Sequence, residues 1–241
     1  MISIIIGYYR NKGMLEYQLA SINKYAKHIR DQFEFIVIDD GSPDMPAVDV
    51  INNSDTEGMN LKLFRVDKDI PWNQVYARNL GATKAENELV FFLDIDHVIP
   101  EGMAEYLSTL KVNAGEYHTF GRRKVLRLDP YTYRNVNPSN CLFVISKSDF
   151  FRVGAYDVDF CGNYGYSDAW LKHRMTVGGI KKVLHDTVCL DCFMYTVIPQ
   201  ANDMSRERDK RKNRVLWEAK MRKKSPLNTS LLSGATYTQL L

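Results

Sequence analysis

The sequence of 241 residues predicts an α/β protein, in which a mostly parallel sheet is flanked by helices and followed by a basic helical extension. Three observations support this prediction. Apolar, β-branched runs alternate with segments of helical periodicity in the first half, which is typical of parallel strands joined by helices. The composition, with 45% hydrophobic and 25% charged residues, is that of a globular protein with a full core. Basic residues concentrate late in the chain, within residues 205–224.

Strands and helices alternate regularly only in the first half. Residues Ile2 to Ile6 form a continuous apolar run, which suits a strand that is buried on both faces. Strands are expected over residues 2–6, 33–38, 61–66 and 88–93, and helices over 15–29 and 73–85. In the second half we expect strands over 139–146 and 180–184, a short helix near 149–151, a helix over 167–175 capped by Ser167, and a polar helix over about 203–224.

The absence of targeting signals in the sequence indicates a reducing compartment, in which cysteines stay free. No apolar run approaches the roughly 20 residues that cross a bilayer, and the first residues lack the pattern of a signal peptide. We therefore expect a cytoplasmic protein without disulfides. Cys161, His185, Cys189 and Cys192 are a candidate zinc set, but a second tight pair of ligands is missing. Buried free thiols, which include Cys141, are the preferred interpretation.

Polar clusters follow three of the expected strands. They are Gly7 to Asn11, Asp39 to Ser42, and Asp94 to Asp96. The carboxyl ends of parallel strands meet at one edge of a sheet, where such folds bind ligands. Residues i and i+2 of an extended segment share a face, so Asp94 and Asp96 suit a Mg²⁺ or Mn²⁺ ion that carries a phosphate. The alternative is an Asp-rich turn that caps the next helix. The chain has no glycine-rich phosphate loop.

Five motifs occur together in the order of a known family. They are Tyr9-Arg10-Asn11, Asp39 to Ser42, Asn73 with Ala77 to Ala82, Asp94-Ile95-Asp96 with Pro100, and Gly162 to Asp168 with Leu171 and Arg174. Over residues 1–192 the chain thereby resembles nucleotide-sugar glycosyltransferases of the GT-A fold, and most of all family 2. Ser167 departs from the family pattern, which usually has Glu there. The resemblance implies a Rossmann-like GT-A domain at 1–200, with a nucleotide-sugar-binding half (1–100) and an acceptor half (101–200), followed by a basic extension at 201–241.

The resemblance also implies roles for single residues. Tyr9 would stack on the nucleotide base, Asp40 would accept a hydrogen bond from uracil, and Arg78 would lie near the diphosphate. The implied nucleotide-binding set is Gly7, Tyr9, Asp39, Asp40, Arg78, Asp94 and Ile95. Each of four residues has an alternative role. Asp39 would orient the loop, and Tyr9 would pack on the sheet edge. Asp40 would be a turn residue, and Arg78 would be a solvated charge on a helix.

The metal ligands implied by the resemblance are Asp94 and Asp96. Asp191 is the third candidate by spacing, with Cys192, His185 and His97 as alternatives. Asp168 would be the general base, and its alternative role is that of an acid in the first turn of a helix.

The implied activity is a Mn²⁺- or Mg²⁺-dependent, inverting transfer of a sugar from a nucleotide sugar, with UDP expected, to a hydroxyl group of a glycan. One alternative acceptor is a hydroxymethylated DNA base. Another alternative is a non-catalytic module that binds nucleotide sugar or nucleic acid. Residues 205–224 carry ten Lys or Arg and three acids, a pattern that binds nucleic acid or an anionic membrane surface. A solvated helix that packs on the domain is the other interpretation of this segment.

Overall fold

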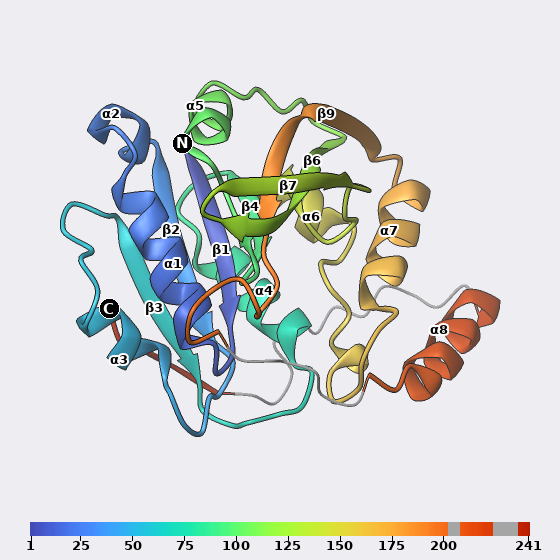
Figure 1. Cartoon of the computed structure of the whole chain (residues 1–241). Coiled ribbons are helices and arrows are strands. Elements are labelled where there is room, and N and C mark those ends of the chain that lie inside the picture. Colours follow the sequence, from blue (N-terminus) through green and yellow to red (C-terminus); the bar gives the residue numbers. More distant parts are fainter. Residues whose placement is uncertain (202–207, 224–235) are drawn as a thin grey trace.

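The computed structural model describes residues 1–201, 208–223 and 236–241. In these residues the strands form one sheet with the order β10-β3-β2-β1-β4-β8-β6-β9-β5, and β7 pairs with β6 (Figure 1). The strands are β1 (Ile2–Tyr8), β2 (Phe33–Asp39), β3 (Leu61–Val66), β4 (Leu89–Asp94), β5 (His97–Val98), β6 (Glu116–Leu128), β7 (Tyr131–Val136), β8 (Phe143–Ser146), β9 (Lys181–Cys192) and β10 (Tyr237–Gln239). The helices are α1 (Lys12–Asn23), α2 (Lys27–Arg30), α3 (Ala47–Asn52), α4 (Gln74–Lys84), α5 (Glu101–Ser108), α6 (Lys147–Arg152), α7 (Ser167–Val177) and α8 (Arg211–Lys223), with a 3₁₀ turn at Val158–Phe160.

The first half has the expected parallel strands. β1 lies between β2 and β4, and β2 pairs with β3, all in parallel. Tyr8 is in register with Asp39, and Gly7 is in register with Asp94. The polar clusters that follow these strands therefore meet at one edge of the sheet, as the sequence predicts.

The second half makes the sheet mixed, which corrects the expectation of a mostly parallel sheet. β8 is antiparallel to β4 and β6, and β5 is antiparallel to β9, whereas β6 and β9 run parallel. The hairpin of β6 and β7 was not expected, because its charged and tyrosine-rich strands lack an apolar run. The prediction of an α/β sheet with flanking helices is otherwise correct.

Helices cover both faces of the sheet and build a core on each (Figure 1). Alternate residues of β1 divide between the two cores: Ile4 packs with α1, α3 and α5, and Ile5 packs with α4, α6 and α7. Residues of β2 divide in the same way, with Phe35 in the first core and Ile36 in the second. This two-sided burial explains why these strands read as continuous apolar runs rather than as alternating ones.

Three element boundaries differ from the expectation. The helix expected over 15–29 is two helices, α1 and α2, and the strand expected over 180–184 extends as β9 to Cys192. Tyr166, with a φ of 64°, occupies the N-cap of α7, and Ser167 is the first helical residue. The helix expected over 203–224 is present as α8 within the described residues, and its positions at 203–207 and 224 lie outside them. No helix of the described residues has the length and apolar character that crossing a membrane requires.

A histidine network lies between β6, β9 and α5. The hydroxyl of Tyr106 lies 2.9 Å from Nδ1 of His185, and Nε2 of His185 lies 2.9 Å from Nδ1 of His118. Burial and the charge of His185 lower the pKa of His118, and burial lowers the pKa of His185. The His–His hydrogen bond needs one neutral acceptor nitrogen, so protonation of both rings breaks it.

This network predicts that the protein loses stability in mild acid. Unfolding returns both imidazoles toward a pKa of about 6.5, so the unfolded chain binds protons more readily as the pH falls below that value. We expect His185→Gln to reduce the acid-induced fall in Tm by about 2–4 °C. Thermal unfolding followed by circular dichroism from about pH 8 to about pH 5 measures this. The exposed His28→Gln variant should keep the wild-type pH dependence, and the same dependence in His185→Gln would contradict the prediction.

Candidate active site

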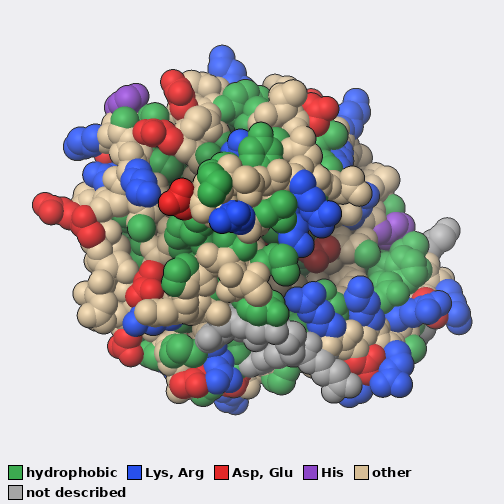
Figure 2. Space-filling model, in the orientation of Figure 1, with side chains coloured by type: hydrophobic (Ala, Val, Ile, Leu, Met, Phe, Trp, Pro, Cys, Tyr) green, Lys and Arg blue, Asp and Glu red, His purple; other side chains and the backbone are tan. Residues whose placement is uncertain are grey.

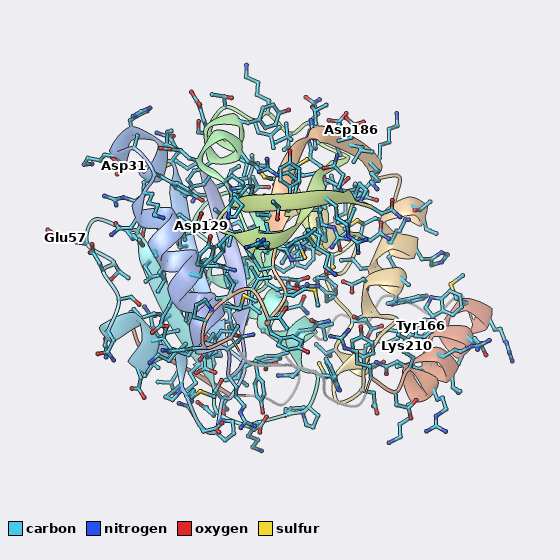
Figure 3. The ribbon with its side chains drawn as sticks, in the orientation of Figure 1. Asp31, Glu57, Asp129, Tyr166, Asp186 and Lys210 are labelled. Atoms are coloured by element: carbon cyan, nitrogen blue, oxygen red, sulfur yellow. The ribbon has the colours of Figure 1, made fainter. Side chains whose placement is uncertain are left out.

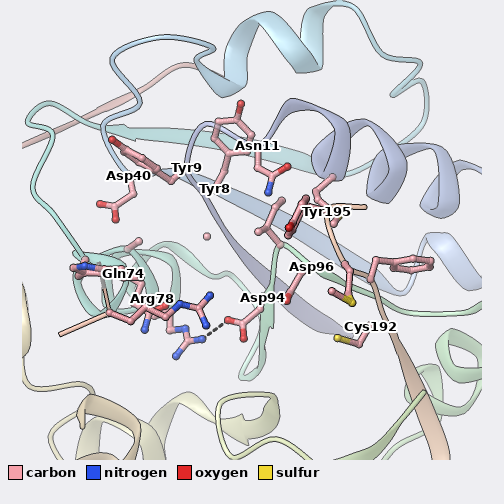
Figure 4. A pocket seen from close by; sticks show the side chains of 18 of the residues that line it. Tyr8, Tyr9, Asn11, Asp40, Gln74, Arg78, Asp94, Asp96, Cys192 and Tyr195 are labelled. Carbon is pink, nitrogen blue, oxygen red and sulfur yellow. Dashed lines mark hydrogen bonds and ion pairs between the residues drawn. The ribbon is translucent and has the colours of Figure 1, made fainter. Parts of the chain in front are cut away.

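A cavity of about 620 Å³ opens at the carboxyl ends of β1 and β4. Its lining includes most of the predicted site residues, namely Gly7, Tyr9, Asp40, Arg78, Asp94, Ile95 and Asp96. Tyr9 and Asp40 lie on one side of the cavity, and Arg78, Asp94 and Asp96 lie on the other (Figure 4). A Cβ atom at Gly7 would meet no protein atom within 4 Å, so the glycine leaves open space at the cavity wall.

The loop after β2 presents one acid to the cavity and uses the other internally. Asp40 lines the cavity, and its Oδ1 accepts a hydrogen bond from Nδ2 of Asn73 at 2.9 Å. Asp39 is only 1% exposed, and its oxygens accept from the backbone N–H groups of Ser42 and Ala47, both at 2.9 Å. Asp39 therefore has the position of a loop-orienting residue, which was its alternative role.

Arg78 joins two carboxylates that lie 74 positions apart in the sequence. Its side chain is buried on α4, donates to Oδ1 of Asp94, and donates to Oδ1 of Asp168 at 3.0 Å. Tyr156 accepts from Arg78 at 2.8 Å and donates to Asp168 at 3.0 Å. Burial lowers the pKa of Arg78, but the charges of Tyr156, Asp94 and Asp168 raise it well above its usual value. Arg78 is thus a fixed cation between the two acids rather than a solvated helix charge.

Asp168 lies in the first turn of α7. Arg78, which lines the cavity, donates a hydrogen bond to it. The residues that line the cavity do not include Asp168 itself. Its side chain is 32% exposed, and among the described residues only its Oδ1 accepts side-chain hydrogen bonds. The second oxygen therefore remains accessible, while Arg78 and Tyr156 hold the first.

Three potential metal ligands converge beside Asp94. One ligand atom each from Asp96, His97 and Cys192 lies within 4.8 Å of the others. Nδ1 of His97 lies 2.7 Å from Oδ1 of Asp96. Burial lowers the pKa of His97, but the hydrogen bond to Asp96 and the neighbouring Cys192 raise it to about 10. We call Asp96, His97 and Cys192 the metal cluster.

The donor atoms of this cluster fit a divalent cation. The carboxylates of Asp94 and Asp96 suit Mn²⁺ and Mg²⁺, and the nitrogen of His97 and sulfur of Cys192 favour a softer ion. Together they fit Mn²⁺ better than Mg²⁺.

The placement of Asp191 corrects its assignment as the third metal ligand. Its oxygens accept from Nε of Arg123 at 2.9 Å and from the hydroxyl of Tyr131 at 2.6 Å. Neighbouring residues of a strand point to opposite faces, so Asp191 faces away from the metal cluster that Cys192 joins. The alternative zinc set is not assembled in the described part of the chain either, because His185 belongs to the histidine network.

Gln18 positions the Asp94–Asp96 segment, a role that the sequence did not reveal. It is buried on α1, and its Nε2 donates to the carbonyl oxygens of Ile95 at 2.8 Å and His97 at 2.9 Å. These hydrogen bonds hold the backbone of the segment in one conformation, which in turn orients its two acids. Only the helical spacing of α1 gave a sign that this position is buried.

The loop before Asp168 packs against α8. The buried Asn213 donates from Nδ2 to the carbonyl oxygens of Phe160 at 3.1 Å, Asn163 at 2.8 Å and Gly165 at 2.9 Å. Tyr166 and Lys210 lie side by side where this loop meets the chain that leads into α8 (Figure 3). A contact between α8 and the loop thus supports the residues that precede Asp168.

Part of the basic charge of α8 serves this packing. Nζ of Lys220 lies 2.9 Å from Asp157 and 2.6 Å from Asp159, and Arg214 pairs with Glu218 at 2.9 Å. The Lys220 pairs join α8 to the domain, as expected of a helix that packs on it, whereas the Arg214–Glu218 pair lies within the helix. Packing on the domain was one of the interpretations of residues 205–224.

Comparisons with known proteins agree with the motif order. Residues 3–114 match the family described as glycosyltransferase like family 2. An uncharacterized glycosyltransferase of Haemophilus influenzae is 35% identical over 108 residues. The match covers 44% of this chain and 40% of the relative. Residues 3–114 are therefore similar to family 2 glycosyltransferases. The predicted resemblance is confirmed.

Solved structures with which this chain superposes show that it has the GT-A fold. S. aureus TarS 1–349 in complex with UDP-GlcNAc superposes with a TM-score of 0.61 at 14% identity, over 80% of this chain and 58% of that chain. The mannosyltransferase PcManGT of Pyrobaculum calidifontis, in complex with GDP-Man and Mn²⁺, gives a TM-score of 0.63 at 14% identity, over 97% of this chain and 70% of that chain.

Proposed function

We propose that the protein is a metal-dependent, inverting glycosyltransferase that moves a sugar from a nucleotide sugar, with UDP as the nucleotide, to a hydroxyl group of a glycan. The observation that carries this proposal is the Asp94–Arg78–Asp168 bridge. It places an acid of the metal motif and the candidate base on the two sides of one buried cation. The solved relatives with UDP-GlcNAc and with GDP-Man and Mn²⁺ support a nucleotide-sugar donor and a divalent ion.

The residues of the cavity account for donor binding. Tyr9 offers its ring to the base, and Asp40 offers a carboxylate to the base edge, where uracil has an N–H donor. Asp94, Asp96, His97 and Cys192 would hold the ion. When bound, a divalent cation offsets the charge that develops on the diphosphate as the sugar leaves.

Asp168 accounts for activation of the acceptor. Its accessible oxygen takes the proton of the acceptor hydroxyl as that hydroxyl attacks C1 of the sugar. A single displacement with one base inverts the configuration at C1. The side chains of Tyr131 and Tyr133, which are 46% and 47% exposed on β7, offer aromatic faces to a glycan acceptor.

The metal assignment predicts that Asp96→Ala weakens nucleotide binding only when Mn²⁺ is present. Asp96 supplies the carboxylate of the metal cluster, and its side chain is 46% exposed. A ligand at 100 times its Kd adds about 2.7 kcal/mol to stability. We therefore expect a thermal shift with UDP and Mn²⁺ in the wild type, and a reduced shift in the variant.

The matched control is Asp129→Ala, which removes a surface acid outside the cavity lining. If Asp96→Ala keeps the full Mn²⁺-dependent shift, Asp96 is not a metal ligand. A wild type that shows no shift with any nucleotide sugar, with or without Mn²⁺, would contradict the proposed donor.

A further inference from the structure

Basic side chains line the part of the cavity wall that the β6–β7 hairpin forms. Arg122 and Lys124 of β6 and Arg134 of β7 all contribute to the lining. Arg122 and Lys124 alternate along β6 and so share a face, and Arg134 lies directly opposite Lys124 in the antiparallel ladder. We call these three residues the basic wall. Lys and Arg side chains gather beside the recess in the view of Figure 2.

Strand pairing connects the basic wall to the metal cluster. Lys124 is in register with Cys192 of β9, and Cys192 is in register with His97 of β5. Adjacent strands lie about 4.8 Å apart, so the Lys124 side chain begins one strand spacing from Cys192. The side chain of Arg122 reaches the metal cluster itself, since its Nη1 lies 3.3 Å from Nε2 of His97. The wall therefore flanks the position proposed for the donor diphosphate.

The positive charge of the wall is only partly balanced by the described residues around it. Among residues 1–201, 208–223 and 236–241, no carboxylate pairs with Lys124 or Arg134. Like charges that lie directly opposite each other in an antiparallel pair are destabilising. Arg122 donates to the carbonyl oxygen of Asn137 at 2.8 Å, and its charge contributes to the lowered pKa of Asp96. A bound anion would relieve this repulsion.

We propose that the basic wall is a phosphate-binding site that holds the donor diphosphate beside the metal cluster. The protein then retains affinity for the terminal phosphate of a nucleoside diphosphate even without a divalent ion. This inference rests on the proposed function for the identity of the donor. Hydrogen bonds between cationic side chains and phosphate oxygens are short and strong, and they persist on the nucleotide product after the sugar has left.

Calorimetric titration of UDP and UMP in the presence of EDTA tests the proposal, because the two ligands differ by the terminal phosphate. The wild type should bind UDP about 10- to 100-fold more tightly than UMP, the range expected for hydrogen bonds to charged groups. The double variant Lys124→Gln/Arg134→Gln should lose most of this ratio. GDP and GMP provide a second pair for the same measurement.

Arg127→Gln is the matched control, since it removes a cation from β6 outside the cavity lining and should keep the wild-type ratio. The double variant Lys124→Arg/Arg134→Gln has one cation more than Lys124→Gln/Arg134→Gln and should recover part of the ratio. Thermal unfolding confirms that each variant is folded. An unchanged ratio in the double variant, or a wild type without preference for UDP or GDP in EDTA, would overturn the proposal.

Failure of the phosphate site and failure of the proposed sugar transfer give different results. If the preference for the diphosphate is present and depends on the wall, the phosphate site stands even where the wild type transfers no sugar. If the double variant instead binds UDP normally but requires more acceptor for transfer, the wall serves the acceptor, and the proposal for the donor is wrong.

Discussion

Asp168→Asn is expected to lower the rate of sugar transfer by about 100- to 10,000-fold, the range that a general base contributes. The amide cannot take the proton of the acceptor hydroxyl. It keeps the shape of the carboxylate, and its oxygen still accepts from Arg78 and Tyr156, which hold that position at 3.0 Å in the wild type. The affinity for the nucleotide sugar should stay nearly unchanged, because Asp168 is not part of the cavity lining.

Two measurements separate catalysis from binding for this variant. Steady-state transfer gives kcat, and calorimetric titration with the nucleotide sugar gives Kd. Asp186→Asn is the matched control, since Asp186 of β9, labelled in Figure 3, does not line the cavity and its variant should keep the wild-type kcat. If Asp168→Asn retains most of its kcat, Asp168 is not the base.

Arg78→Met is expected to lower both stability and activity. The methionine fills similar space but leaves Asp94 and Asp168 without their shared cation. Removal of one partner from a buried charge pair costs about 3–5 kcal/mol. We expect about 3 kcal/mol here, because Asp94 and Asp168 are 29% and 32% exposed and water can reach them. Transfer should also fall, since Asp168 loses a contact that orients it.

Urea unfolding of the variant gives the change in stability. Arg152→Met is the matched control, because Arg152 pairs with Asp149 at 2.6 Å but is 51% exposed, and such pairs contribute only about 0–1 kcal/mol. Arg78→Lys keeps a positive charge but cannot fork between two carboxylates, so it should recover only part of the loss. Equal stability of Arg78→Met and the wild type would contradict the bridge.

The first half of the fold was predictable because each of its strands can be recognised from a short stretch of the sequence. Strands buried on both faces read as apolar runs, as Ile2 to Ile6 and Phe33 to Ile38 do, and parallel pairing then fixes where their ends lie. The placement of Asp40, Asp94 and Asp96 at one edge followed from that pairing. The motif order also pointed to Arg78 and Asp168 as site residues, but nothing in the sequence indicated that the two side chains touch.

The second half was less predictable because its contacts depend on strand register. The β6–β7 hairpin lacks an apolar run, and its consecutive cations Arg122, Arg123 and Lys124 do not reveal which face each side chain takes. Asp191 and Cys192 are neighbours in the chain, so spacing alone did not decide which one faces the metal cluster. The pairing of β9 with β5 and β6 decides it. Tyr156 and Gln18 act through contacts with distant segments and carry no motif of their own.

Nucleotide release by the wild-type protein distinguishes a glycosyltransferase from a module that only binds nucleotide sugars. The protein is incubated with a panel of UDP- and GDP-sugars, with Mn²⁺ and with EDTA, and the release of UDP or GDP to water is measured. A glycosyltransferase with this site should release nucleotide from at least one donor, faster with Mn²⁺ than with EDTA. Tight donor binding with no release under either condition would contradict the claim and would instead indicate a module that binds nucleotide sugars without turning them over.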